Sequence, residues 1–241
     1  MAVISIRELM QCLTGASTAT ATLSVLNHFL GYTEVPRQSV ARNEEIRIRT
    51  QAERLRFFPR FDINLIFVAP ETLPLSVHRR HDENIAYARR LFASAGIAIG
   101  RIKRFKISLE DADGFEEIDS ASEAGDLFAC FSSPAEDEGI DVFVVRLFQR
   151  GDEFKGGHSP VDGSCNNDGK RSGLLVVFNG GSANFAHEIG HYLGLEHPDP
   201  EEASSATDPM LEGATAFAGA EFSIEQGECM RDHCMMRLHC P

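Results

Sequence analysis

The sequence predicts an α+β fold of the α/β-like kind, with helices packed around a mixed sheet. Apolar runs of strand length, separated by turn residues, recur between residues 61 and 178. A segment with helical periodicity, 78–95, lies between the first two of them. The chain has 241 residues, of which 43% are hydrophobic and 24% charged, so it can bury a full core.

The first predicted elements are a strand, a helix and a second strand. Residues 61–69 alternate apolar and polar side chains, which indicates a strand that Pro70 ends. Residues 78–95 carry apolar side chains on one helical face, and Gly96 ends that helix. Alternation returns in 97–109, which predicts the second strand, and we expect an acidic loop after it.

The second half of the sheet comes from residues 140–178. The run 140–148 is almost continuously apolar, as in a strand buried on both faces. A loop-rich stretch with a short edge strand within 154–161 follows, and then a strand at 174–178. Residues 179–182 predict a turn into a helix with Ser182 as its N-cap.

The most informative stretch reads H-E-x-x-H-x-x-G-x-x-H. On a helix, His187 and His191 lie one turn apart on one face, so both imidazoles reach one metal ion. Gly194 can end that helix in the left-handed conformation, and the turn brings His197 to the same ion. Three nitrogen ligands leave a fourth position open, as in a catalytic zinc site. Glu188 is then placed to take a proton from an attacking water.

This stretch resembles the zinc-binding consensus of the metzincin metallopeptidases, and with Pro198 it is similar to matrixin-like and serralysin-like members. The resemblance implies a metzincin catalytic domain. Such a domain has a twisted mixed sheet with a backing helix and an active-site helix, and a small C-terminal subdomain with a Met-turn and a terminal helix. It also implies one catalytic Zn²⁺ held by His187, His191 and His197, with Glu188 as the general base.

The family resemblance further implies a tight turn with a methionine beneath the zinc. Met210 is the candidate, because Pro209 and Gly213 suit a turn. Several members carry a tyrosine two residues after the methionine, and this chain has Glu212 there, so a tyrosine ligand is not supported.

Residues 223–238 predict the terminal helix. Ser223 is its expected N-cap, and Gln226 three residues later completes a capping box. Three further methionines lie in this helix-like stretch rather than in a turn: Met230, Met235 and Met236.

The predicted function is that of a zinc-dependent metalloendopeptidase with a peptide or protein substrate. In such folds an edge strand binds an extended peptide, and loop 156–160 is the candidate rim. His158 in this loop is either a rim residue or an ordinary exposed histidine, and 214–218 is the candidate wall of an apolar pocket. Two alternatives stay open: a zinc hydrolase or exopeptidase on the same scaffold, and a catalytically silent zinc-dependent binding module.

Charge excludes some partners. The net charge of −13 argues against nucleic acid or an anionic membrane surface. No apolar run is long enough for a transmembrane segment. Residues 110–141 hold twelve acids and no lysine or arginine. A weak calcium site at 111–114 would explain some of them, but the calcium-loop pattern is incomplete, so we favour a solvated loop.

The remaining expectations concern domains and cysteines. Residues 1–56 are interpreted as an N-terminal extension or a pro-segment, in which Cys12 is a candidate blocking ligand for zinc. Residues 57–241 form the catalytic domain, divided into 57–197 and 198–241. The family resemblance favours secretion, yet no clear signal peptide is present, so the compartment stays open.

An even cysteine count permits up to three disulfides, and the spacings do not decide the pairing. A second metal site that includes Cys229, His233 and Cys234 is the alternative. Its spacing fits no standard zinc motif. The six cysteines are Cys12, Cys130, Cys165, Cys229, Cys234 and Cys240.

Overall fold

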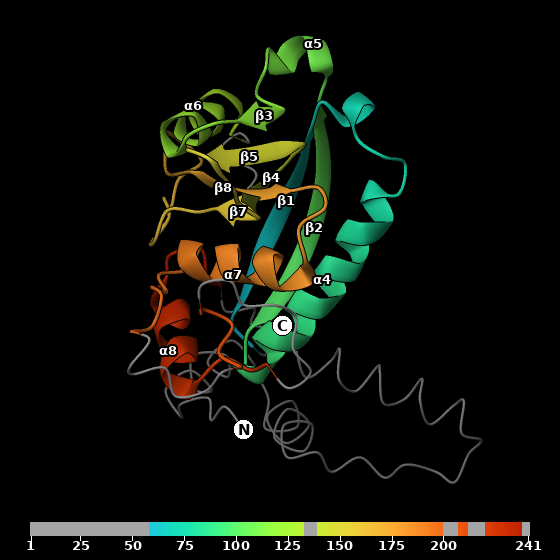
Figure 1. The fold of residues 1–241 in the computed structure, drawn as a ribbon. Coiled ribbons are helices and arrows are strands. Elements are labelled where there is room, and N and C mark those ends of the chain that lie inside the picture. Colours follow the sequence, from blue (N-terminus) through green and yellow to red (C-terminus); the bar gives the residue numbers. More distant parts are fainter. Residues whose placement is uncertain (1–57, 133–138, 200–206, 212–219, 238–241) are drawn as a thin grey trace, which may run out of the picture.

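The computed structural model describes residues 58–132, 139–199, 207–211 and 220–237. At its centre lies a five-stranded sheet with the strand order β2-β1-β4-β8-β7 (Figure 1). Four strands are parallel, and β7 runs antiparallel to β8 at one edge. The strands are β1 (Arg60–Val68), β2 (Ala98–Ile107), β4 (Gly139–Val145), β7 (Gly157–His158) and β8 (Gly173–Val177). The predicted mixed α/β class is therefore confirmed.

The central strands are apolar throughout because both faces of the sheet are covered. Every residue of β4 and β8 is buried. Along β4, Ile140, Val142 and Val144 belong to one core cluster, whereas Phe143 and Val145 belong to the other. The alternation of side chains across a strand thus feeds two separate cores.

Different elements cover the two faces (Figure 1). Helix α4 (Val77–Ser94), the α7 helix (Ser182–Tyr192) and Met230 of α8 (Ile224–Asp232) contribute to the first core. The second core takes side chains from α5 (Leu109–Ala112), α6 (Ala121–Phe131) and a small sheet. That sheet has the order β3-β5-β6, with β3 (Glu117–Ile118), β5 (Leu147–Arg150) and β6 (Glu153–Phe154). A short 3₁₀ turn, η2 (Pro70–Thr72), follows β1.

The acidic region after β2 corrects the prediction of a loop. It contains α5 and α6, which begin after Ser108 and Ser120. Each serine hydroxyl accepts a backbone N–H three residues on, from Asp111 and Glu123 respectively. Glu110, Asp111 and Glu123 therefore lie in first helical turns, where the helix dipole favours negative charge.

Two other boundaries were also predicted wrongly. The apolar run 140–148 is not one strand, because the chain turns at Arg146 and β5 joins the small sheet. The N–H groups of Arg146 and Leu147 both donate to the carbonyl of Glu116, which directs the chain away from β4. The terminal helix stops at Asp232, six residues short of the predicted end.

Within the described ranges, no helix is long and apolar enough to span a bilayer. The predicted extension 1–56, with Cys12, lies outside the described residues. The division of the catalytic domain into 57–197 and 198–241 therefore stays a prediction.

Candidate metal centre and active-site cleft

Helix α7 carries the three polar residues of the motif's first half. It follows β8 after a short turn and begins at Ser182, with Gly181 as its N-cap. The prediction of Ser182 as the N-cap is therefore wrong by one residue. Its hydroxyl instead donates to the Asn84 side chain of α4 at 2.8 Å, which ties the start of α7 to the neighbouring helix.

The end of α7 has the geometry that the glycine predicts. Gly194 adopts φ 98°, in the left-handed region. Its N–H donates to the carbonyl of His191 at 2.9 Å, and the N–H of Leu195 donates to that of Gly190 at 3.0 Å. These two bonds form a Schellman motif, which reverses the chain directly after the helix. The reversal returns His197 toward α7.

The structure brings the three predicted histidines together. The Nε2 atoms of His187, His191 and His197 lie 3.0 Å from one another in all three pairs. His191 is buried, His187 half-buried and His197 exposed, so the cluster opens to one side. This is the arrangement that a single metal ion with an open position requires.

The other ring nitrogens identify the tautomers. The Nδ1 atoms of His187 and His191 lie 2.9 and 2.7 Å from the carbonyls of Pro209 and Leu195. A carbonyl only accepts, so each Nδ1 carries the proton and each Nε2 presents a lone pair. Burial lowers the pKa of His191 to about 4, so its ring is neutral at pH 7. Converging lone pairs repel one another unless a cation lies between them, and Zn²⁺ fits this donor set.

Met210 lies beneath α7, where the Met-turn was predicted. It is fully buried, and its sulfur lies 2.6 Å from where a Cβ on Gly190 would be, so a side chain at 190 would force the methionine to move. The preceding carbonyl, that of Pro209, is the one that holds His187. Asp208 fixes the turn by accepting the N–H of Met210 at 2.8 Å. The predicted roles of residues 212–218 fall outside the described residues.

Glu188 lies between the histidines and the edge strand. A Cβ on Gly157 would lie 2.7 Å from Cγ of Glu188, so this glycine lets β7 approach the carboxyl closely. A Cβ on Gly156 would lie 1.7 Å from Nδ2 of Asn184, so a side chain there would force Asn184 to move. Burial raises the pKa of Glu188 to about 8. Sequence reasoning placed the rim at 156–160 but did not recognise the steric need for these glycines.

A cleft of about 850 Å³ runs between β7 and the three histidines. His158 is half-buried there, its ring 5.7 Å from that of Phe148, and burial lowers its pKa. The β5–β6 hairpin also reaches the cleft, a contribution that sequence reasoning missed because no motif marks it. Besides the residues already described, the lining includes Phe148, Arg150, Phe154, Lys155, Ser159, Val161 and Glu196.

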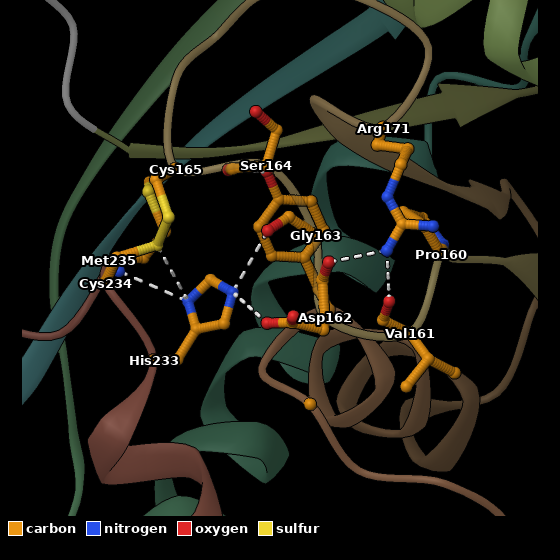
Figure 2. A network of polar contacts seen from close by, with 12 residues as sticks. Pro160, Val161, Asp162, Gly163, Ser164, Cys165, Arg171, His233, Cys234 and Met235 are labelled. Atoms are coloured by element: carbon orange, nitrogen blue, oxygen red, sulfur yellow. Dashed lines mark hydrogen bonds and ion pairs between the residues drawn. A yellow bond between two sulfur atoms is a disulfide. The ribbon is translucent and has the colours of Figure 1, made fainter.

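The cysteines are in part paired. Cys165 and Cys234 form a disulfide with Cα atoms 5.6 Å apart, across 69 residues of sequence. Cys130 and Cys229 are free and exposed. The disulfide contradicts the alternative of a second metal site that includes Cys234. It joins the loop after β7 to the segment after α8, and Figure 2 shows this junction.

The sheet, helix α7 and the histidine cluster support the resemblance to the metzincin-type zinc metallopeptidases. Residues 86–198 match the model of the family described as Metallo-peptidase family M12B, Reprolysin-like. The matched range includes the C-terminal half of α4, the sheet from β2 onward, and α7 with all three histidines. No curated protein sequence matches the chain.

Proposed function

We propose that the chain is a zinc-dependent endopeptidase in which His187, His191 and His197 bind the metal and Glu188 is the general base. The single observation that supports this most strongly is the triangle of Nε2 atoms, 3.0 Å on a side, that lines the cleft. When bound there, zinc supplies Lewis-acid polarisation of the scissile carbonyl and lowers the pKa of water.

Glu188 moves the proton in this scheme. An Oε atom of its carboxylate takes a proton from the attacking water and delivers it to the nitrogen of the leaving amine. Burial disfavours the ionised carboxylate and raises the pKa of Glu188 to about 8. A cation held by the three neighbouring histidines favours the ionised form again, so the group has a pKa suited to both taking and giving a proton.

The edge strand favours internal cleavage over trimming of chain ends. Gly156 is hydrogen-bonded to Val177 of β8, because the Val177 N–H donates to its carbonyl at 2.9 Å. In an antiparallel ladder, hydrogen-bonded and non-hydrogen-bonded residue pairs alternate. The N–H and C=O of Gly157 therefore point away from β8. An extended peptide can pair with these groups and continue past Glu188 in both directions.

The test is Glu188→Ala in the zinc-loaded protein. We expect zinc to be retained, because the three histidines are unchanged, and turnover of a mixed peptide pool to fall at least about a hundredfold, the scale of a lost general base. Zinc content and the cleavage products are measured on the same samples. Turnover equal to that of the wild type rejects Glu188 as the base.

The same peptide pool separates the alternatives. Internal cuts that a zinc chelator abolishes support an endopeptidase. Trimming confined to peptide ends supports an exopeptidase on this scaffold, and a fully zinc-loaded wild type that cuts nothing supports a binding module.

A further inference from the structure

The loop after β7 carries the carbonyl-capping contacts of the active-site helix. We call residues 159–172 the rim loop. The N–H groups of Asp162 and Gly163 donate to the carbonyls of His191 and Tyr192 at 3.0 and 2.8 Å. The last carbonyls of a helix have no partners within it, so these bonds satisfy the Tyr192 carbonyl and add a second donor to the His191 carbonyl, which also accepts the Gly194 N–H. One of the two carbonyls belongs to a histidine of the metal cluster.

Tyr192 strengthens this contact. Its ring is fully buried, and its hydroxyl donates to the carbonyl of Ser164 at 2.8 Å. A Cβ on Gly163 would lie 2.3 Å from the Tyr192 ring, so the rim loop passes directly over the ring at a glycine. Arg171 holds the loop from its other side, because its guanidinium donates to the carbonyl of Asp162 at 2.6 Å.

The segment after α8 holds the rim loop in turn. His233 is almost completely buried and lies between the disulfide and the loop (Figure 2). Its Nδ1 accepts the N–H of Met235 at 3.2 Å, so the ring proton is on Nε2. That Nε2 donates to the carbonyl of Gly163 at 3.2 Å and lies 3.5 Å from Oδ1 of Asp162. The Cys165–Cys234 disulfide fixes the same two segments covalently.

We propose that His233 and the Cys165–Cys234 disulfide are positioning elements of the metal centre. They hold the rim loop against the end of α7, where the loop donates to the carbonyl of His191, and the loop continues directly from the end of the edge strand β7. Without them, zinc affinity and peptide binding weaken together while the polar residues of the cleft are intact. Because one link is a disulfide, the site is tightest when this pair is oxidised.

The experiment compares His233→Phe, His233→Gln and the double variant Cys165→Ala/Cys234→Ala with the wild type. Phenylalanine fills the space without a donor, whereas the glutamine amide can still donate to the Gly163 carbonyl. The disulfide is removed by substitution with alanine rather than by a reducing agent, because dithiol reductants bind zinc themselves. Cys130→Ala is the matched control, since this free, exposed cysteine lies on α6, which packs on the opposite face of the sheet.

Zinc dissociation constants are measured by competition with a chromogenic chelator. We expect them to rise about tenfold to a hundredfold in His233→Phe and in the double variant, the usual effect of losing a group that supports a metal ligand. The zinc dissociation constant of His233→Gln should rise less than that of His233→Phe, and that of Cys130→Ala should match the wild type. In His233→Phe and in the double variant, hydrogen exchange at the amides of Asp162 and Gly163 should accelerate at least about tenfold, whereas exchange at the β4 amides should not change.

A folded His233→Phe variant with wild-type zinc affinity and wild-type exchange at these two amides overturns the proposal. If the double variant does not fold, the phenylalanine and glutamine variants decide the question. We also expect KM to rise with little change in kcat, and this expectation rests on the proposed function. The measurements of zinc affinity and hydrogen exchange do not depend on that function. A wild type that binds zinc tightly but cuts no peptide therefore overturns the endopeptidase proposal alone.

Discussion

At the scale of single residues, His81 is a buried polar side chain whose loss of hydration is not compensated by hydrogen bonds. It lies on α4, fully buried, with its ring against Phe67 and Phe185. In the part of the chain that the structure describes, neither ring nitrogen has a hydrogen-bond partner. Burial, followed by the charge of Arg80, lowers its pKa to about 4 from the usual 6.5. The ring is therefore neutral in the folded protein at pH 7.

This histidine makes stability depend on pH. Between about pH 6.5 and 4 the unfolded chain binds a proton at His81 and the folded chain does not, so acid favours unfolding. At pH 5 we expect this group alone to lower the free energy of unfolding by about 2 kcal/mol relative to pH 7.5. In His81→Phe that contribution disappears. Urea unfolding of both proteins at the two pH values measures it, and identical pH dependence contradicts the assignment.

At the scale of elements, the approach of β7 to α7 determines the width of the cleft. A Cβ on Gly157 would lie 2.7 Å from Glu188 Cγ and 2.8 Å from the backbone oxygen of Leu175. The strand cannot accommodate both contacts without moving, because one of them is with the neighbouring strand's backbone. The position of the edge strand is thus set by the absence of a side chain.

The corresponding variant is Gly157→Ala. We expect displacement of β7 to cost about 1–3 kcal/mol of stability, as for other overpacked sites, and to lower kcat/KM for peptides by about tenfold or more. Thermal unfolding and peptide kinetics measure the two effects. Gly181→Ser is the matched control: a Cβ there meets nothing within 4 Å, and serine is a good N-cap for α7. Equal behaviour of the two variants contradicts the steric argument.

At the scale of the whole molecule, the metal centre joins distant parts of the chain. His187 and His191 come from α7, His197 from the segment after its reversal, and the Pro209 carbonyl supports His187 from below. A ligand that binds only this folded arrangement stabilises the fold by mass action. The repulsion between the Nε2 lone pairs of His187 and His191, which a cation relieves, acts in the same direction.

Zinc removal should therefore lower the melting temperature. With free zinc a thousandfold above its dissociation constant, the expected stabilisation is about 4 kcal/mol, or roughly 10 °C for a domain of this size. Differential scanning calorimetry with and without chelator measures it. The shift should be absent in His191→Ala and should return when zinc is added back. Recovery with calcium alone indicates that a different site stabilises the fold.

The sequence by itself determined the active-site helix and the central strands, because their signals are local. The spacing of His187, His191 and Gly194 is meaningful only on a helix that ends where α7 ends. Strands buried on both faces need continuous apolar runs, and 140–145 and 174–177 are such runs. Helix α6 also had a local signal, Ser120 followed by Glu123, which the interpretation by charge overlooked.

Only the tertiary structure decided the features that join residues far apart in the sequence. Cys165 could pair with any other cysteine, and packing of the segment after α8 against the rim loop selects Cys234. The glycines at 156 and 157 look like ordinary loop residues until α7 is placed against them. The physical reason is the same in each case: sequence patterns report which conformation a segment prefers, whereas steric contact and pairing depend on which other segment folding brings beside it.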